Sequence, residues 1–154
     1  MSHKEKAKAL FLEGYNCAQA VVGAYADEIG VPFEQAVKIA SPFGGGMGRL
    51  REVCGALSGV FLVLGYLQGY SDPKDPALKL ALYQKVQALA KRYAAAHGGT
   101  YVCREMLAHL GVDQSPTPSP RTESYYKERP CARLVYDACE LFDAFLEEQK
   151  KAEN

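Results

Sequence analysis

Apolar residues recur along most of the chain at the three- and four-residue spacing that is typical of amphipathic helices. This spacing predicts helical segments over residues 4–12, 17–30, 32–41, 52–69, 76–97 and 100–111 and from residue 130 onward. Because nearly every segment has this period, we expect an all-α fold. The chain is predicted to be one domain, residues 1–154, built as a bundle of about five to six helices.

Start and stop signals delimit several of these helices. Asn16, with Gln19 three residues later, predicts a capping box that makes Cys17 the first helical residue. Asp75 followed by Pro76 predicts the cap and first position of a long helix. These signals place helix ends beside residues that carry chemistry.

The segment over residues 52–69 has no charge after its first residue. Gly55 and Gly59 lie four residues apart, on one side of the helix, with the small side chains of Ala56 and Ser58 nearby. We therefore predict a central helix whose glycine face is closely approached by a neighbouring backbone or a cofactor. The segment is marginal as a membrane span, so a buried core helix is the favoured interpretation.

A proline-rich stretch separates the last two helical segments. Residues 113–121 contain three prolines together with Ser, Thr and Gln. This composition predicts a mobile surface loop near residues 112–129.

Charge excludes some classes of partner. The chain has 154 residues with 18 Lys and Arg against 18 Asp and Glu, which gives a formal net charge of +0. This balance disfavours nucleic acid as a partner. The apolar run near the N-terminus, residues 9–12, is too short for a secretory signal, so we expect a cytoplasmic protein with no membrane span.

Five cysteines in a reducing compartment indicate metal binding or redox chemistry more than structural disulfides. No two of them form a C-x-x-C pair, but four fall in or near the first turn of a predicted helix: Cys17, Cys54, Cys103 and Cys131. A helix N-terminus favours the thiolate, so we predict that at least three share a site and that Cys17 is an accessible thiolate with a lowered pKa. The alternative is isolated thiols that pack as small apolar groups. Cys139 lies mid-helix and is assigned to packing.

A glycine-rich loop follows Phe43, and its glycines are Gly44, Gly45, Gly46 and Gly48. The loop matches neither the dinucleotide-binding nor the P-loop pattern. Its backbone N–H groups could form a nest for an anion such as a cluster sulfide, a thiolate or an oxyanion, with Arg49 and Arg51 adding positive charge. The alternative is a tight connection that needs positive φ angles.

Two histidines and two tyrosines are weaker candidates. His97 and His109 could replace a thiolate as metal ligands, but each lies near a helix C-terminus, where an imidazolium simply complements the dipole. Tyr125 and Tyr126 could cover the site or act only as loop anchors.

The order of these motifs resembles a redox-active protein family named for its C_GCAxxG_C_C pattern. The resemblance rests on Cys17 after Gly14-Tyr15-Asn16, on the glycine loop, on the block Cys54-Gly55-Ala56-Leu57-Ser58-Gly59, and on Cys103 and Cys131. The literal order in the block is C-G-A-x-x-G. The resemblance implies a small bacterial or archaeal protein in which these four cysteines carry redox or iron–sulfur chemistry, while Cys139 has no place in the pattern.

These observations predict electron transfer or thiol redox through a multi-cysteine centre, with an unidentified redox partner protein. An iron–sulfur cluster is the preferred cofactor. A structural zinc site, or a small-molecule or anion-binding module without redox activity, is the alternative from another class. A dithiol that forms a disulfide without metal is a third. The sequence leaves catalytic residues unidentified and a homodimer open.

Overall fold

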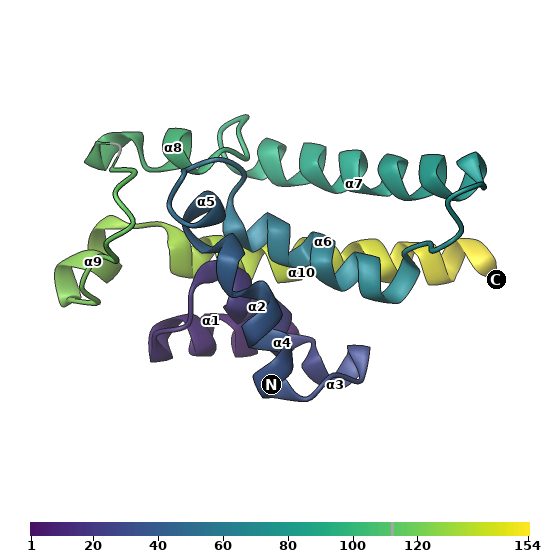
Figure 1. The fold of residues 1–154 in the computed structure, drawn as a ribbon, viewed down its shortest axis with the longest axis horizontal. Helices are drawn as coiled ribbons and strands as arrows, with labels where there is room; N and C mark the ends of the chain where they lie inside the picture. The colour runs from purple at the N-terminus through teal and green to yellow at the C-terminus, as the bar shows by residue number, and fades with distance from the viewer. Residues whose placement is uncertain (112) are drawn as a thin grey trace.

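The computed structural model describes residues 1–111 and 113–154, and it consists of helices joined by short connections (Figure 1). The α-helices are α1 (His3–Glu13), α2 (Cys17–Ala24), α3 (Ala26–Ile29), α4 (Phe33–Ala40), α5 (Gly44–Met47), α6 (Gly55–Gln68), α7 (Pro76–Ala96), α8 (Cys103–Met106), α9 (Glu123–Glu128) and α10 (Cys131–Glu153). Short 3-10 turns cover Ser41–Phe43 and Ala108–Leu110. Within the described residues, β pairing is limited to an isolated antiparallel bridge between Val53 and Val102. The predicted all-α class is confirmed.

The helices pack around a core shared by α2, α6 and α10. Helix α2 contacts α1, α4 and α6, while α10 contacts α1, α2, α6 and α7. In Figure 1, α7 follows one long edge, the α1–α4 group lies on the opposite side, and α6 and α10 run between them. Fully buried side chains such as Val21, Leu57 and Phe142 fill this space. The arrangement brings several helix N-termini to the same end of the molecule.

The predicted capping signals are present. The Asn16 side chain accepts a hydrogen bond from the Gln19 backbone N–H at 2.9 Å, and the Gln19 side chain accepts one from Asn16 N–H at 3.0 Å. Asp75 accepts hydrogen bonds from the N–H groups of Ala77 and Leu78 at the start of α7. The chain starts both helices where the sequence places them, because these side chains satisfy otherwise unpaired N–H groups.

The prediction of one continuous helix from Cys17 to Gly30 is wrong. Helix α2 ends at Ala24, and α3 begins at Ala26 after a non-helical residue, Tyr25 (φ −103°, ψ 7°). The Tyr25 hydroxyl donates a hydrogen bond to Asp143 of α10 at 2.8 Å, and its ring is wholly buried. The break thus coincides with a tertiary anchor, which helical periodicity does not encode.

Helix α6 starts three residues later than predicted. Residues Val53 and Cys54 are extended, since Val53 bridges Val102 and Cys54 N–H donates to the Tyr101 carbonyl at 2.8 Å.

The glycine face of α6 packs closely on α2. A Cβ atom at Gly59 would lie 2.9 Å from the Cβ atom of Val21. Helices α2 and α6 therefore pack backbone against backbone at this point.

The loop expected over residues 112–129 contains helix α9, so a loop throughout is wrong for residues 123–128. Thr122 caps α9 by accepting a hydrogen bond from Tyr125 N–H at 3.1 Å. Residue 112 lies outside the described residues, and the mobility of the stretch stays a prediction. No helix in the described part of the chain is long and apolar enough to cross a membrane.

Candidate four-cysteine site

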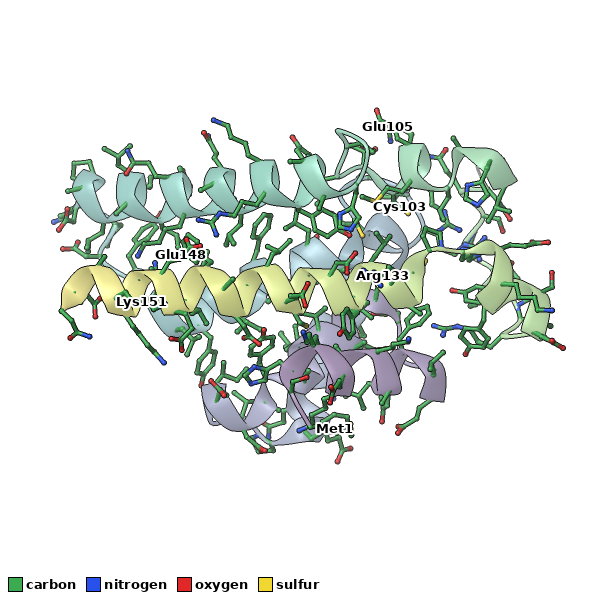
Figure 2. All side chains as sticks on the ribbon, turned by 180° about the vertical axis from the view of Figure 1, so that it is seen from behind. Met1, Cys103, Glu105, Arg133, Glu148 and Lys151 are labelled. Carbon is green, nitrogen blue, oxygen red and sulfur yellow. The ribbon has the colours of Figure 1, made fainter. Side chains whose placement is uncertain are left out.

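One pocket is lined by four of the five cysteines, and we call it the four-cysteine pocket. Its cysteines are Cys17, Cys54, Cys103 and Cys131. The cavity measures about 60 Å³, which is room for a few waters or one small group. In Figure 2, Cys103 lies at α8 on the side that faces α10, whereas Glu148 lies towards the other end of α10. Cys139 does not line this pocket and is wholly buried in the core.

Each of the four cysteines stands at the start of a helix. Cys17, Cys103 and Cys131 are the first residues of α2, α8 and α10, and Cys54 is the residue just before α6. The predicted placement in or near first turns is confirmed. Helix N-termini present unpaired N–H groups and a partial positive charge, so the pocket is built to face negative charge.

Two glycines allow this convergence. A Cβ atom at Gly55 would collide with the Sγ atom of Cys17 and lie 2.9 Å from the carbonyl oxygen of Phe43. A Cβ atom at Gly46 would lie 2.7 Å from the Cβ atom of Cys103. A larger residue at Gly55 would push α2 and α6 apart, and one at Gly46 would push the glycine-rich loop away from Cys103 at the start of α8.

The glycine-rich loop includes α5, but Gly45 and Gly46 within α5 do not have right-handed helical angles, so the loop is a left-handed turn. Its residues with positive φ, between 53° and 70°, are Gly45, Gly46, Met47, Gly48 and Arg49. Hydrogen bonds from Arg51 N–H to the Gly45 carbonyl (3.2 Å) and from Glu52 N–H to the Gly46 carbonyl (2.9 Å) close the turn. Non-glycine residues rarely adopt this conformation, so Met47 and Arg49 are held there by their surroundings. Gly45 lines the four-cysteine pocket, whereas Gly44 and Gly48 line the cavity beside it.

Burial favours the protonated form of three pocket thiols, Cys17, Cys54 and Cys131, contrary to the prediction for Cys17. Burial raises the pKa of Cys17, although hydrogen bonds from the backbone N–H groups of Gly45 and Ala18 oppose the change. Burial also raises the pKa of Cys54 to about 12, and that of Cys131 well above its ordinary value. The predicted low pKa is therefore wrong, because loss of solvent outweighs the helix N-terminus.

Two pocket thiols have side-chain hydrogen-bond partners from other segments of the chain. The Cys54 Sγ atom and the hydroxyl of Tyr93, on α7, are 3.2 Å apart and share a hydrogen bond. The Arg51 guanidinium donates a long hydrogen bond, 3.8 Å, to the Cys103 Sγ atom. Helical periodicity over residues 76–97 does not reveal where the Tyr93 hydroxyl points.

The two histidines do not line the pocket. His97 contacts the backbone carbonyl of Tyr93 at 2.8 Å and the carboxylate of Asp137 at 3.0 Å. His109 lies 2.8 Å from the Glu128 carbonyl oxygen. Both imidazoles are thus engaged outside the four-cysteine pocket.

Arginine supplies the charge around the thiols. The pocket lining includes Arg51, Arg121 and Arg129 and no carboxylate. Tyr125 also lines it, while the Tyr126 hydroxyl bonds with Arg121 at 3.3 Å and with the Leu12 carbonyl. Arg121 and Arg129 were not singled out by the sequence. They flank a short segment that begins with the cap residue Thr122 and contains Tyr125 and Tyr126, and this pattern is the sequence signal that could have identified them.

The donor set suits an iron–sulfur or zinc centre, since four thiols are the usual ligands of both. All five cysteines are free thiols. Within residues 1–111 and 113–154, however, no three Cys, His, Asp or Glu side chains stand close enough to hold one metal ion. The chemistry of the residues fits such a centre, and their spacing would have to shorten to bind it.

The fold and the pocket define a small helical protein with a cysteine-centred site. The model of the family described as "Putative redox-active protein (C_GCAxxG_C_C)" matches residues 15–145, and the chain belongs to this family. No curated protein and no solved structure matches the chain.

Proposed function

We propose that the protein carries electrons through the four-cysteine pocket. One observation carries the proposal: four cysteines, each at or directly before the start of a different helix, line one cavity. They are the four that we assign to the family pattern, and Cys139, which we leave outside that assignment, is packed elsewhere. Thiols that served only as core filler would have no reason to meet at helix N-termini.

The preferred carrier is an iron–sulfur cluster held by the four cysteines, and such a cluster would supply one-electron transfer. A metal deprotonates its thiol ligands, which would overcome the raised pKa values of Cys17, Cys54 and Cys131. The guanidinium groups of Arg51, Arg121 and Arg129 would then balance the negative charge of the thiolates. The helix N-termini would add to this balance.

A metal-free dithiol is the second candidate, because a disulfide needs only two of the four pocket thiols to approach each other, and within the described residues no three Cys, His, Asp or Glu side chains stand close enough to hold one metal ion. Two of the pocket thiols would lose two protons and two electrons as one S–S bond forms. The disulfide of a redox partner protein would accept them and become two thiols. Both candidates place the protein in a reducing compartment such as the cytoplasm, where resting thiols stay reduced.

Serine substitutions, one at a time, test the proposal on protein purified without oxygen. If a cluster is bound, we expect Cys17→Ser, Cys54→Ser, Cys103→Ser and Cys131→Ser each to lose most of the iron and the visible absorbance. If a dithiol operates, two of these four variants should lose the redox-dependent disulfide. Cys139→Ala is the matched control and should keep both, at a cost of about 1 kcal/mol in the free energy of unfolding.

The spectrum also separates the candidates. Visible absorbance with iron and sulfide indicates a cluster, and a disulfide without metal indicates the dithiol. A colourless protein with one zinc and no reversible oxidation would overturn the redox proposal. So would loss of the cofactor in Cys139→Ala while two of the other four variants keep it.

A further inference from the structure

A second, larger cavity adjoins the four-cysteine pocket. It measures about 460 Å³, within the range of about 300 to 1,000 Å³ that is typical of small-molecule sites. We call it the arginine pocket, after the four side chains that line it: Arg49, Arg51, Arg121 and Arg129. Three of these arginines, with Asn16, Gly45 and Tyr125, line both cavities. A molecule in the arginine pocket would therefore lie beside the thiols.

The positive charge in this cavity is mostly uncompensated. The lining of the arginine pocket contains no Asp or Glu. Among the described residues, only Arg49 of the four forms an ion pair, with Asp113 at 3.1 Å. Guanidinium groups stay charged at any physiological pH, so gathering them costs free energy unless an anion joins them.

The arginines are held in place before any ligand binds. The ring of Tyr125 lies between two of them, with its centroid 4.9 Å from the Arg121 guanidinium and 4.6 Å from that of Arg129. Arg121 also donates hydrogen bonds to the carbonyls of Phe11 and Tyr15, both at 2.9 Å. Because these side chains are already ordered, an anion would not have to immobilise them.

One buried N–H group among the four arginines has no hydrogen-bond acceptor within the described residues. The Nε atom of Arg49 is buried and has no hydrogen-bond partner among the described residues. Its other nitrogens donate to Ser119 at 3.2 Å and to Asp113. A buried N–H group without an acceptor is uncommon, so the protein contacts of Arg49 leave part of its hydrogen-bonding capacity unused.

We propose that the arginine pocket binds the oxyanion group of a small anionic molecule, next to the four-cysteine pocket. Arginine is the side chain suited to this task, since its planar fork donates paired hydrogen bonds to the oxygens of phosphate or carboxylate. Three uncompensated charges favour a dianion over a monoanion. The site stands whether or not the thiols are redox-active. That the bound molecule is the substrate of the thiols rests on the proposed function.

Calorimetric titration of the reduced protein at constant ionic strength tests the site. The probes are inorganic phosphate, phenyl phosphate and acetate. We expect phosphate to bind at least tenfold more tightly than acetate. Phenyl phosphate should bind at least as tightly as phosphate if the cavity takes an organic phosphate, because Pro116, Pro118 and Tyr125 line its wall. Weaker binding of phenyl phosphate assigns the site to the free inorganic anion.

Two substitutions should change phosphate affinity in opposite directions. Arg129→Gln removes one charge and should weaken binding about tenfold, as expected for one charge-assisted hydrogen bond. Asp113→Asn removes the carboxylate that pairs with Arg49 and should strengthen binding. Arg92→Gln is the control, because Arg92 carries the same charge but pairs with Glu148 on the surface, away from both pockets.

Unchanged phosphate affinity in both Arg129→Gln and Asp113→Asn would overturn the proposal, as would equal losses in Arg129→Gln and Arg92→Gln. The redox proposal is tested separately by the cysteine variants. If those variants lose the cofactor while phosphate binds nowhere, the arginines serve the thiolates alone and only the anion site is wrong. If phosphate binds while all cysteine variants behave like Cys139→Ala, only the redox function is wrong.

Discussion

Cys54 and Cys139 occupy two environments that share most local properties and differ in one. Both thiols are buried, at 5% and 0% exposure, and burial raises the pKa of both. Each lies beside a wholly buried tyrosine, Tyr93 or Tyr25. The difference is position: Cys54 precedes a helix and faces a cavity, whereas Cys139 lies in the middle of α10.

The two tyrosines show what that difference means. The Tyr25 hydroxyl donates to Asp143 at 2.8 Å, and His3 stacks on the Tyr25 ring and lies 3.0 Å from the same carboxylate. These contacts tie α1 and the α2–α3 junction to α10. The Tyr93 hydroxyl instead meets a thiol that lines a pocket. Burial and residue type therefore do not distinguish the pocket cysteine Cys54 from the core cysteine Cys139. What distinguishes Cys54 is its place where several helices begin beside one cavity.

The largest expected change in the free energy of unfolding comes from adding a side chain at Gly55, where the starts of α2 and α6 are in contact. Gly55→Ala would drive a methyl group into the Cys17 Sγ atom, and we expect a loss of about 3 kcal/mol in the free energy of unfolding. Gly65→Ala is the matched control in the same helix, because nothing lies within 4 Å of its Cβ position. That change should stabilise the protein by about 0.5 to 1 kcal/mol through better helix propensity.

Urea unfolding of both variants measures the difference. Thiol counting on the folded proteins shows whether Gly55→Ala also opens the four-cysteine pocket. Equal stabilities for Gly55→Ala and Gly65→Ala would mean that α2 and α6 do not approach as closely as described.

The second prediction tests the property that Cys54 and Cys139 share, which is a thiol pKa raised by burial. A raised thiol pKa stabilises the folded state below the ordinary value of 9.0, and this stability is lost as pH rises towards the folded value, about 12 for Cys54. Between these values the unfolded chain releases a proton that the folded chain keeps. Each such thiol should therefore lower the free energy of unfolding by about 1.4 kcal/mol per pH unit above about pH 9.

Urea unfolding between about pH 9 and 11 checks this slope. Cys54→Ala and Cys139→Ala should each make it shallower by the same amount relative to the unchanged protein, although only Cys54→Ala should affect the cofactor. A slope that responds to one substitution and not the other would show that the two thiols are not equally desolvated.

Much of this architecture could be predicted from sequence, because it is local. The capping box at Asn16, the start of α7 at Asp75 and the helix-start position of Cys17 depend on residues three or four apart. The break at Tyr25 depends on Asp143, more than a hundred residues away, and no local pattern contains it. The raised pKa of Cys17 has a related cause: the helix start is visible in the sequence, whereas the depth of burial is set by packing.

The site was predicted in part for the same reason. Four cysteines could be assigned to helix starts, but their meeting at one cavity depends on how α2, α6, α8 and α10 pack. Arg121 and Arg129 line the pocket and pack against the ring of Tyr125, a contact that the proline-rich composition of the preceding loop does not suggest.

The smallest expected effect concerns the hydroxyl that touches Cys54. Hydrogen bonding by Tyr93 lowers the pKa of the Cys54 thiol against the larger effect of burial, so Tyr93→Phe should raise it further. A hydrogen bond of about 0.5 to 1 kcal/mol corresponds to roughly a threefold lower thiolate fraction. Alkylation of Cys54 at about pH 9, followed by mass spectrometry, should slow by about that factor.

Cys139 in the same sample corrects for any general loosening of the fold. Tyr25→Phe is the matched control and should leave the rate at Cys54 unchanged, because its hydroxyl bonds with Asp143 and the Cys139 carbonyl. Equal slowing at Cys54 in both variants would show that Tyr93 acts on the whole core, and the distinction between the two tyrosines would then be wrong.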